Sequence, residues 1–384
     1  MKQQTEKKKG AWWQHISILF FLAIGGFCGF FIGKMVGQDL AGDRPIWKTL
    51  LMALGLLLWV YAALIIHIIL HEAGHLCFGL MSGYQFSSFR IFSLMWIKEN
   101  DSIKFRRLAV AGTGGQCLMT PPDMVNGKIP VTLYNLGGSI MNLIVAVICF
   151  ILYFVFAHIP FVSTVLLFFA VIGLIIAVMN GIPMRTGTVD NDGYNAFALT
   201  RSSDAMHAFW IQMKVNEQLA QGMRLKNMPN EWFAVPSDEA MKNSMVAAVG
   251  VFVCNRLMDA KQFEQAESLM SHMMEIESGM VGLHRSLMIC DRMYIEMITK
   301  GQSEMLDGML TKEQKAFMKQ MKSFPTVLRT EYVYALLCEK DIAKAQKIKE
   351  QFEKCAKNYP YQCDVQSERE LIEIAEAKSN HISF

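Results

Sequence analysis

The sequence predicts a polytopic α-helical membrane protein followed by an all-α soluble domain. The chain has 384 residues, of which 52% are hydrophobic, and its mean hydropathy is positive. Four long apolar runs lie between residues 16 and 180. About 18 or more apolar residues suffice for a helix to cross the hydrocarbon core of a bilayer, and each run reaches that length. Long apolar runs disappear after about residue 200, so a membrane part is followed by a soluble part.

We expect membrane spans at about 16–34, 49–82, 136–157 and 161–180, within a domain that covers 16–199 and follows a short N-terminal segment, 1–15. Three lysines, Lys7 to Lys9, precede the first run as they would in a secretory signal. The apolar core of this run is long, however, and no cleavage site of small residues follows it. An uncleaved first helix is therefore predicted.

The positive charges predict the orientation of the spans. Lysines are frequent before the first span, and the segment between the second and third spans also carries Lys98, Lys104, Arg106, Arg107 and Lys128. Cytoplasmic loops are enriched in Lys and Arg, so both segments belong on the cytoplasmic side. With four spans, both termini of this multi-pass protein are expected in the cytoplasm.

The segment 87–112 clusters apolar and polar residues around the turn-like "KENDS". This pattern predicts a membrane-associated β-hairpin at the cytoplasmic face, with an amphipathic surface helix as the alternative. A strand edge there could hold an extended substrate by backbone pairing, or the segment could serve only as an anchor through its aromatic side chains. The glycine-rich stretch 112–123 is expected to be a loop.

The second span contains "HEAGH", residues 71–75. Because His71 and His75 are four residues apart, they share one face of a helix and can reach one metal ion. Glu72, beside the first ligand, can take a proton from a water held there. Gly74 leaves room for a neighbouring helix. An ordinary structural role is the alternative, but ionisable groups are costly in a membrane and usually mark function.

His67 lies one turn before His71 and invites a site of three histidines. It is eight residues from His75, which is roughly 12 Å of helical rise and too far for both to bind one ion. We expect a supporting or packing role for His67.

The third ligand should come from another segment, because catalytic zinc usually takes three protein ligands. The stretch 178–197 follows the last span directly, and its proline and glycines stop the helix and let the chain fold back. Asp192 is the expected ligand and Asp190 the competitor, while the alternative for either is a solvated turn aspartate. By the charge pattern, this segment and the HEAGH motif reach the same, cytoplasmic side of the membrane.

These motifs together resemble those of the site-2 protease family of intramembrane zinc metalloproteases. The family has HExxH on one span, Gly-x-x-x-Asn on the next and Asn-x-x-Pro followed by Asp-Gly on a later one. Here they read "HEAGH", "GSIMN" from Gly138 to Asn142, and "NGIP" before "DG". Ser139 stands where a proline is often found, and the spacing from Pro183 to Asp192 is longer than in many members.

The resemblance covers roughly residues 50–197. It implies a Zn²⁺ ion bound by His71, His75 and Asp192, with Glu72 as the catalytic base. It also implies that Asn142 binds or orients the substrate backbone, while an interhelical hydrogen bond is the alternative for this residue. The implied substrate is a transmembrane or membrane-anchored peptide.

The segment 200–384 predicts an all-α cytoplasmic domain. Two helix pairs, 254–277 and 331–360, resemble tetratricopeptide units, with Ala266 and Ala345 at the tight contacts. Such a domain could bind a protein partner or promote self-association. Its many methionines are expected in the core rather than in a binding groove.

Composition excludes some classes of function. The net charge is only +3 and no basic patch is evident, so a nucleic-acid partner is not expected. Nine scattered cysteines, an odd number with no metal-ligand spacing, indicate reduced thiols.

The expected activity is that of a zinc metalloendopeptidase. It would cut a peptide bond within or near a membrane-spanning segment of its substrate, from a cytoplasmic-side active site, in regulatory proteolysis or in processing of signal or pheromone peptides. One alternative is a catalytically inactive relative that acts as a client-binding scaffold. The other is a metal transporter, which would need acidic residues or histidines on several spans.

Overall fold

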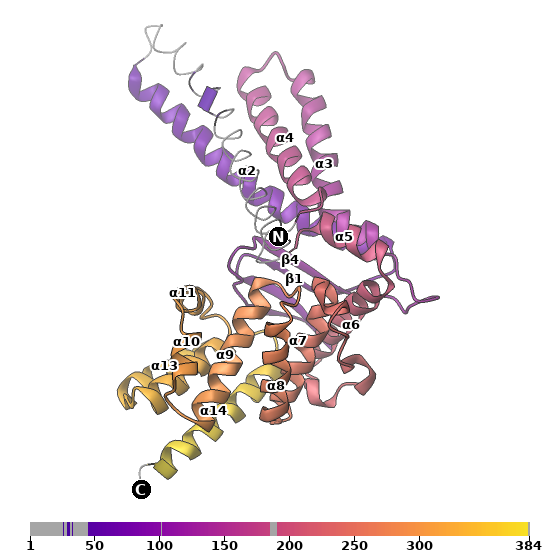
Figure 1. Cartoon of the computed structure of the whole chain (residues 1–384). Helices are drawn as coiled ribbons and strands as arrows, with labels where there is room; N and C mark the ends of the chain where they lie inside the picture. The colour runs from indigo at the N-terminus through magenta and orange to yellow at the C-terminus, as the bar shows by residue number, and fades with distance from the viewer. Residues whose placement is uncertain are drawn as a thin grey trace, which may run out of the picture. The chain divides into compact units, whose positions relative to one another are not determined.

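The computed structural model describes residues 45–382, except residue 101 and residues 185–189, together with residues 26, 29, 30 and 33. The chain divides into two compact units, whose helices and strands are labelled in Figure 1. The first unit comprises Met1–Ser82 and Val131–Phe197, and the second comprises Gly83–Pro130 and Ala198–Phe384.

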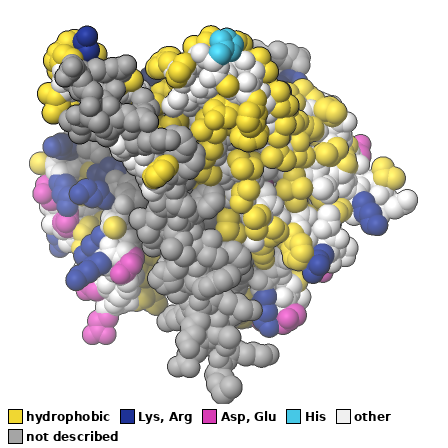
Figure 2. Space-filling view, turned by 90° about the horizontal axis from the view of Figure 1, so that it is seen from above, with side chains coloured by type: hydrophobic (Ala, Val, Ile, Leu, Met, Phe, Trp, Pro, Cys, Tyr) yellow, Lys and Arg dark blue, Asp and Glu magenta, His cyan; other side chains and the backbone are white. Residues whose placement is uncertain are grey.

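Three helices of the first unit, α2 (Ile46–Met81), α3 (Val131–Val155) and α4 (Pro160–Gly181), are long and apolar enough to cross a membrane. Many of their outward side chains are large and apolar, and Leu57 and Phe154 are each 61% exposed. Figure 2 shows hydrophobic side chains in a broad area that contains few charged ones. Lipid suits such a surface, whereas water does not.

These helices correspond to three of the four expected spans. The first expected span, 16–34, lies outside the described residues apart from four positions, all of them helical. Helix α2 begins three residues before the predicted span 49–82 and ends one residue before its end. Its 36 residues make a rod of about 54 Å. A hydrocarbon core is only about 30 Å thick. Trp47 and Lys48 lie at the start of α2, which suits a membrane interface.

Glycines bring the three helices into direct contact. A Cβ atom on Gly74 of α2 would lie 2.3 Å from the backbone oxygen of Gly137 on α3, and one on Gly137 would lie 2.7 Å from the oxygen of Gly74. Small residues allow helix backbones to approach in this way in membranes. The expected role of Gly74 is thus confirmed. Near this crossing, Gly181 at the end of α4 lies beside Ser139 of α3, so α2 and α4 end on the same side of the unit.

The second unit begins with a four-stranded antiparallel sheet in the order β3-β2-β1-β4. Its strands are β1 (Gln85–Ile91), β2 (Leu94–Glu99), β3 (Ser102–Arg107) and β4 (Gly115–Thr120). The expected hairpin over 87–112 is therefore part of a larger sheet. The loop expected over 112–123 was wrong in its central part, because Gly115–Thr120 pairs with β1. Cys117 and Met119 alternate toward the core, but only over a short strand flanked by glycines and prolines.

The sheet shares its apolar core with the helices that follow. Met95 and Ile97 of β2 are fully buried in one cluster with residues of α7, α8 and α9. The expected domain 16–199 included this segment, whereas its contacts group it with Ala198–Phe384.

Helix α5 (Asp192–Arg201) begins in the first unit, and the helices after it build the rest of the second. They are α6 (Ser203–Ala220), α7 (Ser244–Asp259), α8 (Phe263–Glu275), α9 (Gly282–Thr299), α10 (Glu304–Met309), α11 (Lys312–Gln320), α12 (Pro325–Val333), α13 (Ile342–Ala356) and α14 (Gln362–Ile382).

The expected helix pairs are α7 with α8 and α12 with α13, and a π-helical turn, Tyr334–Cys338, extends α12. Ala266 and Ala345 are buried, as are core methionines such as Met270, Met273 and Met293. The helical character of this part and the core position of these methionines are confirmed. A tetratricopeptide array remains a prediction.

Candidate metal centre

Three side chains of the first unit meet at one point. His71 and His75 lie one turn apart near the end of α2, and Asp192 is the first residue of α5. The Nε2 atoms of His71 and His75 are 3.2 Å apart. Oδ2 of Asp192 lies 2.9 Å from Nε2 of His71 and 3.3 Å from Nε2 of His75. Two donors bound to one tetrahedral zinc at about 2.0–2.1 Å are roughly 3.3 Å apart. The three atoms therefore fit a single ion of this kind.

Among the described residues, these three form the one group of His, Cys, Asp or Glu side chains arranged to hold a metal ion. Asp190, the competitor for the third position, is described but does not belong to this group. Burial opposes ionisation of Asp192, but the adjacent imidazoles of His75 and His71 outweigh it, so its pKa is held well below the ordinary range. An ionised carboxylate is the form that binds a cation.

Glu72 is buried beside the cluster. It and the two histidines are each 7% exposed, on a helix whose other buried side chains are mostly small or apolar. Its position next to His71 in the sequence places a carboxyl group within the same enclosed region. A general base is most effective where bulk water does not compete for the proton.

The backbone of α3 fixes the orientation of His75. Its Nδ1 lies 2.7 Å from the carbonyl oxygen of Tyr134. Because a carbonyl only accepts hydrogen bonds, Nδ1 carries the proton and donates it, which leaves the lone pair of Nε2 facing the cluster. The identity of residue 134 does not matter for this contact, so sequence reasoning could not find it.

Asn191 places Asp192, and the sequence analysis missed it. Its Nδ2 donates to the carbonyl oxygens of Met179 and Ile182, and its Oδ1 accepts hydrogen bonds from the backbone N–H groups of Met184 and Tyr194. These four bonds fasten the returning chain to the end of α4 and cap the start of α5. The available signal was an asparagine immediately before a helix, a favoured capping position.

Glycine also determines how closely α5 and α3 approach the cluster. A Cβ atom on Gly193 would lie 2.3 Å from the carbonyl oxygen of Gly181. One on Gly138 would lie 2.5 Å from the imidazole of His71. The glycine of "GSIMN" therefore leaves room for a ligand ring, a reason that the sequence motif alone did not supply.

Asn142 lies between two histidines of α2. It is fully buried, with its Nδ2 atom 3.3 Å from Nδ1 of His71 and its Oδ1 atom 3.2 Å from Nδ1 of His67. Since both ends of the amide have partners on α2, these contacts favour the interhelical hydrogen bond over a contact with substrate. His67 is also fully buried and lies outside the metal cluster, in line with a supporting role.

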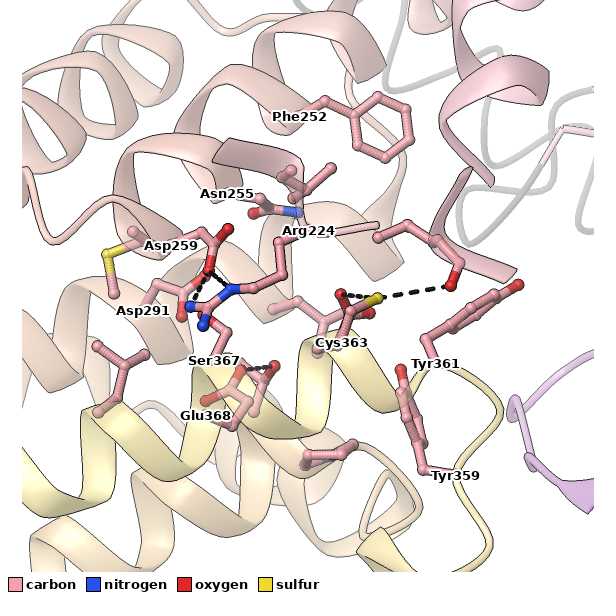
Figure 3. Close-up of a pocket in the computed structure, with 18 of the residues that line it drawn as sticks. Arg224, Phe252, Asn255, Asp259, Asp291, Tyr359, Tyr361, Cys363, Ser367 and Glu368 are labelled. Atoms are coloured by element: carbon pink, nitrogen blue, oxygen red, sulfur yellow. Dashed lines mark hydrogen bonds and ion pairs between the residues drawn. The ribbon is translucent and has the colours of Figure 1, made fainter. Parts of the chain in front are cut away.

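A separate cavity of about 210 Å³ lies within the second unit and is shown in Figure 3. Its polar lining comes mainly from α7, α9 and α14 and includes Asp259, Asp291, Asp364 and Glu368. Arg224 pairs with Asp259 and with Glu370, so much of this charge is neutralised locally. These carboxylates do not form a group suited to a metal ion. The cluster of His71, His75 and Asp192, and not this cavity, is therefore the candidate functional site.

Residues 59–165 match the model of a known family, Peptidase family M50, which is the site-2 protease family. The match contains the HEAGH motif and all of α3, and it ends within α4, before Asp192. It covers roughly a quarter of the chain. No curated protein and no solved structure matches the chain. The match and the three apolar helices together indicate a membrane protein with a peptidase unit.

Proposed function

We propose that the protein is an intramembrane zinc metalloprotease that hydrolyses a peptide bond within or near the membrane-spanning segment of its substrate. The observation that carries the proposal is the set of mutual distances among Nε2 of His71, Nε2 of His75 and Oδ2 of Asp192, between 2.9 and 3.3 Å. This spacing suits one tetrahedral ion, and a buried carboxyl group, Glu72, accompanies it.

His71, His75 and Asp192 would hold the ion. Zinc, when bound, lowers the pKa of water and polarises a peptide carbonyl. Glu72 would accept a proton from the attacking water and deliver it to the leaving amine. Asn191 would hold Asp192 in place, since its four hydrogen bonds fix the turn before α5.

The surroundings of the cluster suggest the class of substrate. The ligands lie among helices whose outer surfaces are apolar, so a substrate embedded in or anchored to the same membrane has the shortest route. A helical peptide bond is shielded by its own backbone, and the substrate would have to unwind locally before attack. Regulatory proteolysis and processing of signal or pheromone peptides both supply such substrates. The distribution of Lys and Arg supports an active site on the cytoplasmic side.

Two other functions are less well supported. An inactive scaffold has no need of three converging ligands with a carboxyl group beside them. A transporter would need ionisable residues along several spans, yet α3 and α4 contain no acidic residue, basic residue or histidine.

Metal content and cleavage together test the proposal. The full-length wild-type protein, purified in detergent, should carry about one zinc ion per chain. Glu72→Gln should retain that zinc but lose proteolysis, because the substitution removes the base and leaves the ligands. Glu313→Gln, an exposed position in the second unit, is the matched control and should behave as wild type. Cleavage by the Glu72→Gln protein, or a wild-type protein that binds no zinc, would refute the assignment.

The same variant can identify the substrate. Membrane peptides that accumulate in cells carrying Glu72→Gln, and not in cells carrying the wild type or Glu313→Gln, are the expected substrates. Their termini in wild-type cells should place the cut within or beside an apolar segment. Identical peptide populations in the three strains would count against a proteolytic role.

A further inference from the structure

Two buried side chains connect the backbone of α4 to the ligand His71. The Nε2 atom of His67 lies 2.9 Å from the carbonyl oxygen of Phe169, and its Nδ1 atom faces the amide of Asn142, whose other end faces Nδ1 of His71. Gly173 makes the first contact possible, because a Cβ atom there would lie 2.4 Å from the ring of His67. The path therefore runs from Phe169 through His67 and Asn142 to His71.

The carbonyl at the start of this path determines where the protons lie. The oxygen of Phe169 only accepts hydrogen bonds, so Nε2 of His67 must carry a hydrogen and donate it. In a neutral imidazole, Nδ1 is then an acceptor. A doubly protonated His67 could donate at both nitrogens, but it would place a charge at a fully buried position among membrane helices, at a cost of several kcal/mol. His67 is therefore neutral and accepts a hydrogen bond at Nδ1.

The amide of Asn142 must therefore turn its NH2 group, the donor, toward Nδ1 of His67. The oxygen and nitrogen of an asparagine amide occupy nearly equivalent positions and exchange by a half-turn of the side chain. With the amide in that orientation, its oxygen faces Nδ1 of His71 and can only accept a hydrogen bond. Nδ1 of His71 then carries the proton, and Nε2 keeps its lone pair. Nε2 is the atom that lies 2.9 Å from Asp192 and 3.2 Å from Nε2 of His75.

We propose that the carbonyl of Phe169, His67 and Asn142 form a hydrogen-bond relay that fixes His71 in the tautomer able to bind metal. His67 and Asn142 are then positioning residues for the metal centre. The inference rests on the proposed function, since the ion is the partner of His71, but its proton assignments begin at a backbone carbonyl. Both ligand histidines are thus oriented by carbonyl groups, His75 directly by Tyr134 and His71 through two side chains.

Four variants of the full-length protein test the relay. Asn142→Leu keeps a similar volume and removes both hydrogen bonds. Asn142→Asp keeps an accepting oxygen toward His71, and its neutral acid form can also donate to His67. His67→Phe removes the start of the relay. The matched control is Asn135→Leu, since Asn135 is a buried asparagine on the same helix whose amide donates to the carbonyl of Val131.

The measurements are the zinc dissociation constant, from competition with a chromophoric chelator, and the visible spectrum of bound Co²⁺. Loss of a partner that orients a metal ligand typically weakens binding 10–100-fold, and we expect a loss of about this size for Asn142→Leu, with an altered cobalt spectrum. Asn142→Asp and Asn135→Leu should stay within about threefold of wild type. His67→Phe should cause a smaller loss than Asn142→Leu. Because both residues act through one path, the double variant that combines His67→Phe with Asn142→Leu should bind zinc no more weakly than Asn142→Leu alone.

Three results would overturn the relay: a folded Asn142→Leu protein that binds zinc as wild type does, an Asn142→Asp protein as weak as the leucine variant, or losses that add in the double variant. If Asn142→Leu does not fold, the aspartate variant and His67→Phe still decide the question. A wild-type protein that binds neither zinc nor cobalt would refute the proposed function itself. Normal zinc binding by wild type and by every Asn142 variant would refute the relay and leave the proposed function intact.

Discussion

At the scale of single residues, each candidate histidine ligand is oriented through its Nδ1 atom, which lies 2.7 Å from the carbonyl oxygen of Tyr134 in His75 and 3.3 Å from the amide of Asn142 in His71. The HEAGH motif, which contains His71, Glu72 and His75, can be recognised in the sequence because a helix of known period brings positions 71 and 75 to one face. No distinctive sequence pattern marks Asn191 or the carbonyl groups of Tyr134 and Phe169. Backbone carbonyls are the same in every residue, and an asparagine in a turn is common. Partners of this kind become visible only when the helices are placed side by side.

The choice between Asp192 and Asp190 gives a prediction at this scale. Asp192→Asn should reduce zinc affinity by about 100-fold or more, because it replaces an anionic ligand at the cluster with a neutral amide. Asp190→Asn is the matched control, since the substitution is the same and lies two residues away, and it should leave zinc affinity within about threefold of wild type. Chelator competition on the purified variants measures both. Equal losses, or a loss confined to Asp190→Asn, would reassign the third ligand.

At the scale of secondary structure, the three long apolar helices α2, α3 and α4 were predictable because their signal is composition over a long window, which local detail does not disturb. The sheet was less predictable. The turn-like "KENDS" revealed that strands meet there, but β4 has only six residues and lies between glycines and prolines, so its alternation is too brief to distinguish from a loop. Its pairing with β1 depends on a partner about 30 residues earlier in the chain.

The crossing of α2 and α3 gives a prediction for these elements. Gly74→Ala would place a methyl group 2.3 Å from the oxygen of Gly137, so the helices must separate and the cluster at the crossing must widen. Overpacking of this kind costs about 1–3 kcal/mol. Gly55→Ala, on the same helix with open space around it, should be neutral or slightly stabilising.

Thermal unfolding in detergent, together with zinc content, compares the two alanine variants. We expect a lower midpoint and weaker zinc binding for Gly74→Ala only. A Gly74→Ala protein that matches Gly55→Ala in both measurements would show that the helices do not rely on this contact.

At the scale of the whole molecule, the second unit has a core of its own and a buried network of charges. Asp259 and Arg224 line its cavity and form an ion pair, and Arg329 is fully buried between Asp291 and Glu368. Asp364 has no cationic partner within ion-pair distance in the described part of the chain. Burial raises its pKa to about 7, and the nearby carboxylates of Glu368 and Asp259 contribute, while Arg224 acts in the opposite direction.

This raised pKa predicts how stability depends on pH. An unfolded aspartate has a pKa of about 3.9. Between that value and about 7, the folded protein holds a proton that the unfolded chain releases. The contribution of Asp364 to stability is therefore present below about pH 4, falls as the pH rises toward 7 and is constant above. Asp364→Asn should remove this dependence and be more stable than wild type at pH 8, by at most about 4 kcal/mol.

Thermal melting of the full-length protein between pH 5 and pH 8 checks this, with the exposed variant Glu313→Gln as the control. The midpoint of wild type and of the control should fall over this range more than that of Asp364→Asn. Parallel pH profiles for all three proteins would mean that Asp364 titrates normally in the folded state.

The length of α2 determines the depth of the chemistry in the bilayer. With Trp47 and Lys48 at one boundary, His71 lies about 35 Å further along the axis, because 23 or 24 residues separate them at 1.5 Å each. Membrane helices tilt by about 20° on average and rarely by more than 40°, so the histidines lie within a few ångströms of the opposite headgroup layer. Under the proposed function, each turnover would consume a water molecule, and bulk water lies near that depth. A substrate helix would then be cut where it leaves the lipid, and its newly formed ends would be released directly into the aqueous phase.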